Sequence, residues 1–129
     1  MTRYRTIQDA VAQFQKAFQR PTNLDFSRIK QDKKVAEAFD LRQKLIYEEC
    51  TELIQAMGQE KETQIKKEAA DLLYVLAGLF VDFGWDMQVI FNRIHQSNMS
   101  KLDENGKPVY RKDGKILKKY RTLKTPKEK

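Results

Sequence analysis

Hydrophobic residues recur at helical spacing near the start of the chain. In residues 7–18 the strongly apolar positions are Ile7, Val11, Phe14 and Phe18. Steps of three and four residues place these side chains on one face of a helix. We expect this helix to end before Pro21, because proline disfavours helical geometry in the residue that precedes it. A polar connector should follow over residues 24–33.

Two longer segments show the same pattern and are separated by only a few residues. We expect one helix over residues 34–57, with Gly58 as its C-cap, because glycine readily adopts the left-handed conformation that ends helices. The next helix should run over residues 62–83 and be stopped by Gly84. Two helices joined by so short a turn are expected to pack antiparallel.

The chain changes character after a fourth predicted helix, which should run from Asp86, as N-cap, to His95 or just beyond. Asn105-Gly106 and Asp113-Gly114 are dipeptides typical of tight turns. The second of these turns is flanked by short apolar pairs, which predict a small β-hairpin with Val109/Tyr110 on one side and Ile116/Leu117 on the other.

Length and composition fit one compact domain over residues 1–129. The chain is 40% hydrophobic and 33% charged, which suffices for a core but leaves a small domain with much surface. We expect an all-α bundle of four to five helices over residues 1–100, a hairpin extension over 101–120 and a mobile basic tail over 120–129.

Cys50 is the only cysteine, so the chain cannot form an internal disulfide, which is typical of a reducing compartment. The N-terminus lacks the apolar stretch of a secretory signal. The longest apolar run, over residues 72–81, is interrupted by Gly78 and is too short to span a bilayer. We therefore expect a cytoplasmic protein that does not enter a membrane.

The positive charge is concentrated at the C-terminal end. Residues 101–129 contain nine Lys and two Arg against two Asp and two Glu, so this segment carries the whole formal charge of +7. Such a tail can attract nucleic acid, or it can be a solvated terminus. A basic nucleic-acid-binding module, or a helical interaction module without catalysis, is therefore an alternative of another class, although nucleic acid is not the partner we expect.

Five carboxylates interrupt the apolar faces of the second and third predicted helices. They read Glu48-Glu49-x-x-Glu52 and Glu68-x-x-Asp71. At about 100° per residue, each set falls within the stripe that the leucines and valines of its helix define. Residues three and four apart on a helix are neighbours, so each set can converge on one point in space.

Carboxylates gathered on buried faces need a cation, a proton or a basic partner. Oxygen ligands alone suit Mg²⁺, with Mn²⁺ as a second possibility. The alternative is a pair of salt-bridged helices in which Arg42, Lys44, Lys66 or Lys67 neutralises the acids. A di-iron site is excluded by the lack of Glu-x-x-His motifs, and a zinc site by the single histidine and single cysteine.

These motifs resemble the MazG-like all-α nucleoside triphosphate pyrophosphatases, a superfamily that includes phosphoribosyl-ATP pyrophosphohydrolase and the dimeric dUTPases. The resemblance extends to Phe18–Pro21, to Arg42, and to His95-Gln-Ser-Asn-Met-Ser-Lys101 with the turn that follows. It covers most of the chain, and it is specific because the acid motif occurs together with Ser-Asn-Met-Ser-Lys.

The resemblance implies Mg²⁺-dependent cleavage of a nucleoside triphosphate, (d)NTP, to the monophosphate and pyrophosphate by a metal-activated water. It implies five metal-binding residues: Glu48, Glu49, Glu52, Glu68 and Asp71. Either Glu48 or Glu49 would accept the proton of the attacking water. The same cluster would serve a phosphoribosyl-ATP pyrophosphatase, which stays open as the second enzyme hypothesis.

Two residues near the end of the fourth helix are candidate substrate contacts. Lys101 can bind a phosphate, and Asn98 can donate to phosphate, sugar or base; the structural alternative for Asn98 is a left-handed helix cap. Phe14, Phe18 and Tyr74 are read first as core residues and second as rings that stack on a base. The apolar residues of the third helix cover more than one face, which predicts a homodimer or tetramer.

Overall fold

The computed structural model describes residues 5–110 and 112–115, and its described elements are four α-helices and one short 3₁₀ helix. The chain divides into two compact units, the first ending at Trp85 and the second beginning at Asp86. Each unit is considered by itself below. That all 129 residues act as one domain stays a prediction.

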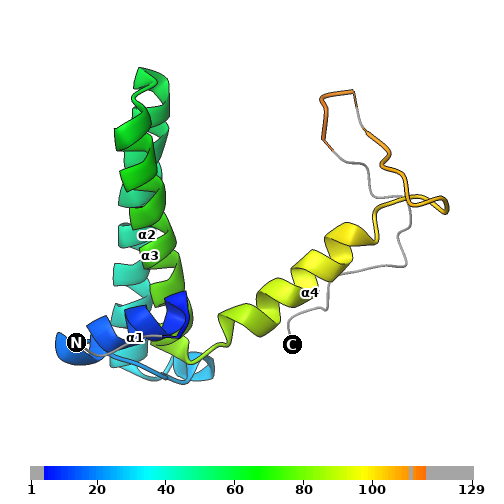
Figure 1. The fold of residues 1–129 in the computed structure, drawn as a ribbon. Helices are drawn as coiled ribbons and strands as arrows, with labels where there is room; N and C mark the ends of the chain where they lie inside the picture. Colours follow the sequence, from blue (N-terminus) through cyan, green and yellow to red (C-terminus); the bar gives the residue numbers. More distant parts are fainter. Residues whose placement is uncertain (1–4, 111, 116–129) are drawn as a thin grey trace. The chain divides into compact units, whose positions relative to one another are not determined.

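The first unit is built on a helical hairpin. α2 spans Lys33–Gln59 and α3 spans Glu62–Phe83. They lie side by side and antiparallel, and α1, Ile7–Ala17, crosses the pair at the end where α2 begins and α3 ends (Figure 1). A 3₁₀ helix, η1, occupies Phe26–Arg28 within the predicted polar connector. The all-α architecture expected from the sequence is confirmed.

Local signals explain where these helices begin and end. The Thr6 hydroxyl accepts a hydrogen bond from the Asp9 amide at 3.0 Å and caps α1, and Asp32 caps α2 in the same way. Gly84 has φ 68° and ends α3 as predicted. The expectation for Gly58 was wrong: α2 continues through it, and Glu60 takes the left-handed conformation with φ 57° instead.

Small and branched residues bring the helices of the hairpin close together. The buried apolar residues of this unit are Val11, Val35, Ala38, Ala56, Ala77, Val81 and Phe83. At the end of the hairpin, Phe26 packs edge-on against Phe39 and Phe83, with ring centroids 5.6 and 5.3 Å apart. The ring centroids of Trp85 and Phe83 lie 5.2 Å apart. Because Phe26 belongs to η1 and Phe83 to α3, these aromatic contacts join η1 to the end of α3.

A buried polar network crosslinks all three helices. The Arg42 guanidinium donates to both carboxylate oxygens of Asp82, at 2.6 and 2.9 Å, and to the Gln15 side-chain oxygen at 3.0 Å. Gln15 in turn donates to Asp82 at 2.9 Å and to the Pro21 carbonyl. A Cβ at Gly78 would overlap the Arg42 guanidinium, so a larger residue here would displace that group from its partners. Arg42 therefore does not neutralise the predicted metal site.

The second unit contains α4, Met87–Met99, and a turn-rich segment. The Asp86 carboxylate accepts a hydrogen bond from the Val89 amide at 3.1 Å and caps α4, as predicted. Asp103 organises the following turn by accepting hydrogen bonds from the Asn105 and Lys107 amides. The described part of residues 101–115 contains no strand, so the predicted hairpin is not found there; Ile116/Leu117 and the basic tail lie outside the described residues.

Among the described helices, no single one is both long and apolar enough to cross a membrane; α3 and α4 pass such a test only when they are counted together.

Candidate metal centre

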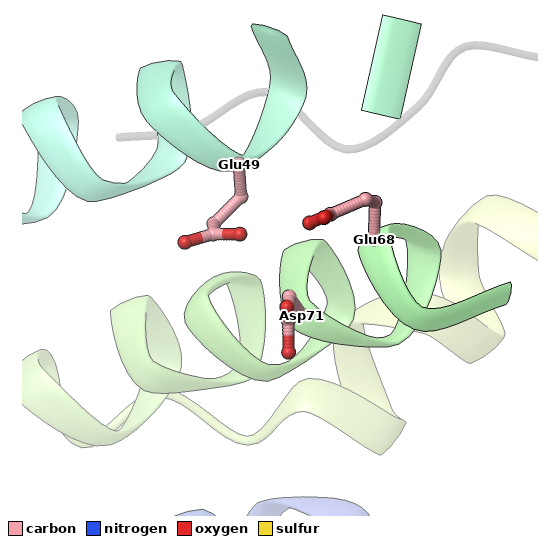
Figure 2. Close-up of side chains that lie close together, drawn as sticks. All are labelled: Glu49, Glu68 and Asp71. Carbon is pink, nitrogen blue, oxygen red and sulfur yellow. The ribbon is translucent and has the colours of Figure 1, made fainter. Parts of the chain in front are cut away.

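Three of the five predicted carboxylates converge between the helices of the hairpin. Glu49 projects from α2 toward α3, which carries Glu68 and Asp71 (Figure 2). One oxygen from each carboxylate lies within 4.8 Å of an oxygen from each of the others. The i,i+3 spacing on α3 supplies two of the carboxylates from adjacent turns, and the antiparallel packing supplies the third.

Burial of α2 explains why Glu49 and not Glu48 faces this point. With Glu48 set at zero on a helical wheel, the buried residues of α2 fall between about 80° and 140°. Those residues are Val35, Ala38, Arg42 and Ala56. Glu49, at about 100°, lies at the centre of this seam, whereas Glu48 lies well outside it and is exposed.

Two of the converging oxygens lack the partners that buried oxygens need. Oε1 of Glu49 and Oε1 of Glu68 are buried, and neither accepts a hydrogen bond within the described part of the chain. Glu68 is 5% exposed, and its other oxygen accepts a hydrogen bond from the side-chain amide of Gln64, Nε2, at 2.7 Å. A buried carboxylate oxygen without a partner is costly, so a cation or a hydrogen-bond donor at this point would stabilise the site.

Electrostatic repulsion within the cluster raises the pKa values of two of the glutamates. Partial burial, together with the negative charges of Asp71 and Glu68, raises the pKa of Glu49. A hydrogen bond with Glu68 raises the pKa of Glu52, and the charges of Glu49 and Glu68 add to the effect. Glu52 thus lies close to the cluster, although its side chain is exposed.

One lysine partly balances these charges. Lys67 Nζ lies 2.7 Å from Oδ2 of Asp71 and 3.8 Å from Oε2 of Glu68. The hydrogen bond to Asp71 raises the pKa of Lys67. Lys66 pairs with Glu62 instead, at 2.7 Å. Of the four basic residues considered, only Lys67 forms salt bridges with the cluster within the described part of the chain. These salt bridges leave the buried Oε1 atoms of Glu49 and Glu68 without a partner.

The donor set fits a hard divalent cation. It offers only carboxylate oxygens, which Mg²⁺ and Mn²⁺ accept readily. Glu49, Glu68 and Asp71 would hold such an ion. The orphaned oxygens of Glu49 and Glu68 are the observation that distinguishes this arrangement from an ordinary acidic surface.

The predicted substrate contacts lie in the second unit. Asn98 is exposed and lies within the last turn of α4, where its carbonyl accepts a hydrogen bond from the Lys101 amide at 3.1 Å. The cap of α4 is Ser100 with a right-handed φ of −72°, so Asn98 does not serve as a left-handed cap. The roles of Asn98 and Lys101 in binding substrate stay predictions.

Sequence reasoning missed Gln64 and the partnership of Arg42 with Asp82. Gln64 stands four residues before Glu68 on α3, a spacing that could have indicated its hydrogen bond. Arg42 and Asp82 are 40 residues apart, and no local pattern connects them.

Comparison with known proteins bears directly on this site. No curated protein matches the chain significantly. The sequence profile of one family, phosphoribosyl-ATP pyrophosphohydrolase, matches residues 11–98, which includes α2, α3 and all five predicted carboxylates. Members of this family are pyrophosphohydrolases that act on phosphoanhydride bonds. The chain therefore belongs to the phosphoribosyl-ATP pyrophosphohydrolase family and is a nucleotide pyrophosphohydrolase.

Proposed function

We propose that this protein hydrolyses a nucleoside triphosphate, (d)NTP, to the monophosphate and pyrophosphate, with Mg²⁺ or Mn²⁺ held by Glu49, Glu68 and Asp71. The observation that carries the proposal is the convergence of these carboxylates on one point with two buried oxygens left unpartnered. A divalent cation supplies charge neutralisation for the phosphates and lowers the pKa of water. That is the chemistry a phosphoanhydride hydrolase needs.

The protein's own part in the reaction is to orient the phosphates and accept a proton. Glu48 and Glu49 are the candidate proton acceptors. Glu49 is the better placed of the two, because one of its carboxylate oxygens lies within 4.8 Å of oxygens of Glu68 and Asp71. Glu48 is exposed and next in sequence, and it can contact solvent at the edge of the site.

An aromatic surface beside the cluster supports a nucleotide as the substrate. The ring of Tyr74 packs edge-on against Phe14 at 5.6 Å, and Phe14 lies 4.6 Å from Phe18. All three rings are exposed, and Phe18 retains 66% of its accessible surface. Tyr74 follows Asp71 by three residues, so it lies on the neighbouring turn of α3. Exposed rings at this place can stack on a base.

Phosphoribosyl-ATP is the second candidate substrate, and the family match supports it equally well. It presents the same phosphate chain to the same carboxylates. Incubation with Mg²⁺ and a panel that contains each dNTP, each NTP and phosphoribosyl-ATP decides between the two. The proposal requires pyrophosphate release from at least one of them; release of orthophosphate alone, or no turnover of any, would contradict it.

We also propose that the protein acts as a homodimer or tetramer. Large apolar side chains of the hairpin are exposed in the single chain, among them Tyr47, Ile54, Met57 and Leu73. Association would bury them, and exposed patches of this kind commonly mark protein interfaces. Sedimentation equilibrium tests this directly, and a mass of 15.2 kDa for the species in solution would refute it.

A further inference from the structure

Lys67 forms ion pairs with two carboxylates of the acid cluster, and no other basic side chain within the described part of the chain does so. Its ammonium group contacts Asp71 at 2.7 Å and Glu68 at 3.8 Å. Its side chain is 62% exposed, whereas that of Glu68 is 7% exposed. The ammonium group thus lies where the buried acids meet solvent.

This position puts Lys67 in competition with a metal ion. Asp71 is one of the three converging ligands, and its Oδ2 is held by Lys67 through a charge-assisted hydrogen bond. A divalent cation bound by Asp71 would repel an ammonium group held so close to the same carboxylate. The long and exposed stem of Lys67 allows the ammonium group to leave without disturbing α3.

We propose that Lys67 exchanges partners during binding: it holds Asp71 in the metal-free site, and it binds a phosphate oxygen of the incoming substrate once the metal has taken Asp71. The inference rests on the proposed function, because it requires a polyphosphate ligand. Such a ligand carries several negative charges, and an ammonium group displaced from Asp71 can bind one of its oxygens in place of the lost carboxylate.

Lys66 provides a matched control for Lys67. It is the preceding residue on α3, it carries the same charge, and it pairs with Glu62 and not with the cluster. Lys66→Met and Lys67→Met therefore change the net charge equally. Only the second removes an ammonium group from the site.

The first experiment titrates each purified variant with Mn²⁺ alone and measures binding by electron paramagnetic resonance. Lys67→Met should bind Mn²⁺ about fivefold more tightly than wild type, because the competing cation is gone. Lys66→Met should change the affinity by less than about twofold, because its charge is exposed and screened. Equal shifts in the two variants would overturn the proposal.

The second experiment measures binding of inorganic pyrophosphate by calorimetry at saturating Mn²⁺. Lys67→Met should weaken this binding about tenfold, because a charged hydrogen bond to phosphate is lost. Lys67→Arg should restore most of it, and Lys66→Met should match wild type. Unchanged pyrophosphate affinity in Lys67→Met would overturn the proposal.

Neither experiment needs turnover, so its failure can be separated from failure of the proposed function. A wild-type protein that binds Mn²⁺ and pyrophosphate but hydrolyses no triphosphate would refute the function and leave the exchange by Lys67 intact. A wild-type protein that releases pyrophosphate while Lys67→Met alters neither affinity would refute the exchange alone.

Discussion

Glu49 on α2 and Glu68 on α3 face each other across the helical hairpin, and each has a buried oxygen that accepts no hydrogen bond within the described part of the chain. Asp71 adds a third carboxylate within 4.8 Å. Packing of the helices holds these charges together, so the folded protein carries an unfavourable interaction that a cation would relieve. We therefore expect the stability and the activity of the protein to depend on the same residues.

Metal binding should raise the stability of the folded protein. An ion that binds only the folded chain adds about 2.7 kcal/mol at a free concentration one hundred times its dissociation constant. Thermal unfolding followed by circular dichroism with Mg²⁺, with Mn²⁺ and with a chelator checks this expectation. Asp71→Asn should lose most of the increase, whereas the surface variant Glu37→Gln, which lies away from the cluster, should keep it.

Substitution of the converging carboxylates should abolish turnover. We expect Glu49→Gln and Asp71→Asn each to lower kcat/KM by about a hundredfold or more, because each removes a ligand and leaves the helix intact. Glu48→Gln tests the division of labour between adjacent glutamates, and it should retain far more activity if Glu49 is the ligand and the base. Full activity in both Glu49→Gln and Asp71→Asn would mean that the site is elsewhere.

The metal-free protein should respond to pH through Glu49. Its pKa is raised in the folded state above the ordinary value of 4.5, so the charged form is disfavoured by folding. This destabilisation is complete above the raised pKa and disappears as pH falls below the ordinary value. Glu49→Gln should therefore be more stable than wild type at neutral pH, and the difference should vanish near pH 4. Urea unfolding across this range in the presence of a chelator measures it; a difference independent of pH would contradict the assignment.

We expect Arg42 to stabilise the fold and to take no part in the reaction. Removal of one partner leaves the other charge buried and unpaired, so we expect Arg42→Met to cost about 3–5 kcal/mol of unfolding free energy. The double variant Arg42→Met/Asp82→Leu should recover much of this loss, because no buried charge remains. Chemical denaturation gives both values. If the double variant is less stable than either single variant, the pair does not act as described.

The aromatic surface should govern substrate affinity. Phe18 is the most exposed of its three rings, so Phe18→Ala should change stability little, while loss of a stacking partner should raise KM for a nucleotide about fivefold or more. The affinity for inorganic pyrophosphate, which has no base, should stay unchanged and serves as the control. A parallel loss of pyrophosphate binding would show that the rings support the fold of the site instead.

Features set by local chemistry were predictable from the sequence. The spacing of apolar residues predicted the helices. Gly84 predicted the end of α3, and Asp86 predicted the start of α4. The end of α2 was misplaced because glycine fits inside a helix as well as after it. Glu60 adopts the left-handed conformation there, and glutamate is not a residue type that predicts this conformation.

The sequence predicted which carboxylates lie near the candidate site, but not which of them converge. Helical periodicity placed the carboxylates on inward faces, but the centre of the seam on α2 is fixed by packing against α3. That packing selects Glu49 and leaves Glu48 exposed. Arg42 was one of several bases near the acids in sequence, and only the tertiary fold shows that Asp82 holds it.

Pyrophosphate release from a panel of triphosphates and phosphoribosyl-ATP, measured for wild type and Asp71→Asn with Mg²⁺ and with a chelator, tests the central claim most directly. The account predicts release of one pyrophosphate per monophosphate by the wild type with Mg²⁺, and almost none after chelation or in Asp71→Asn. Release that persists at the wild-type rate in the chelator and in Asp71→Asn would contradict it.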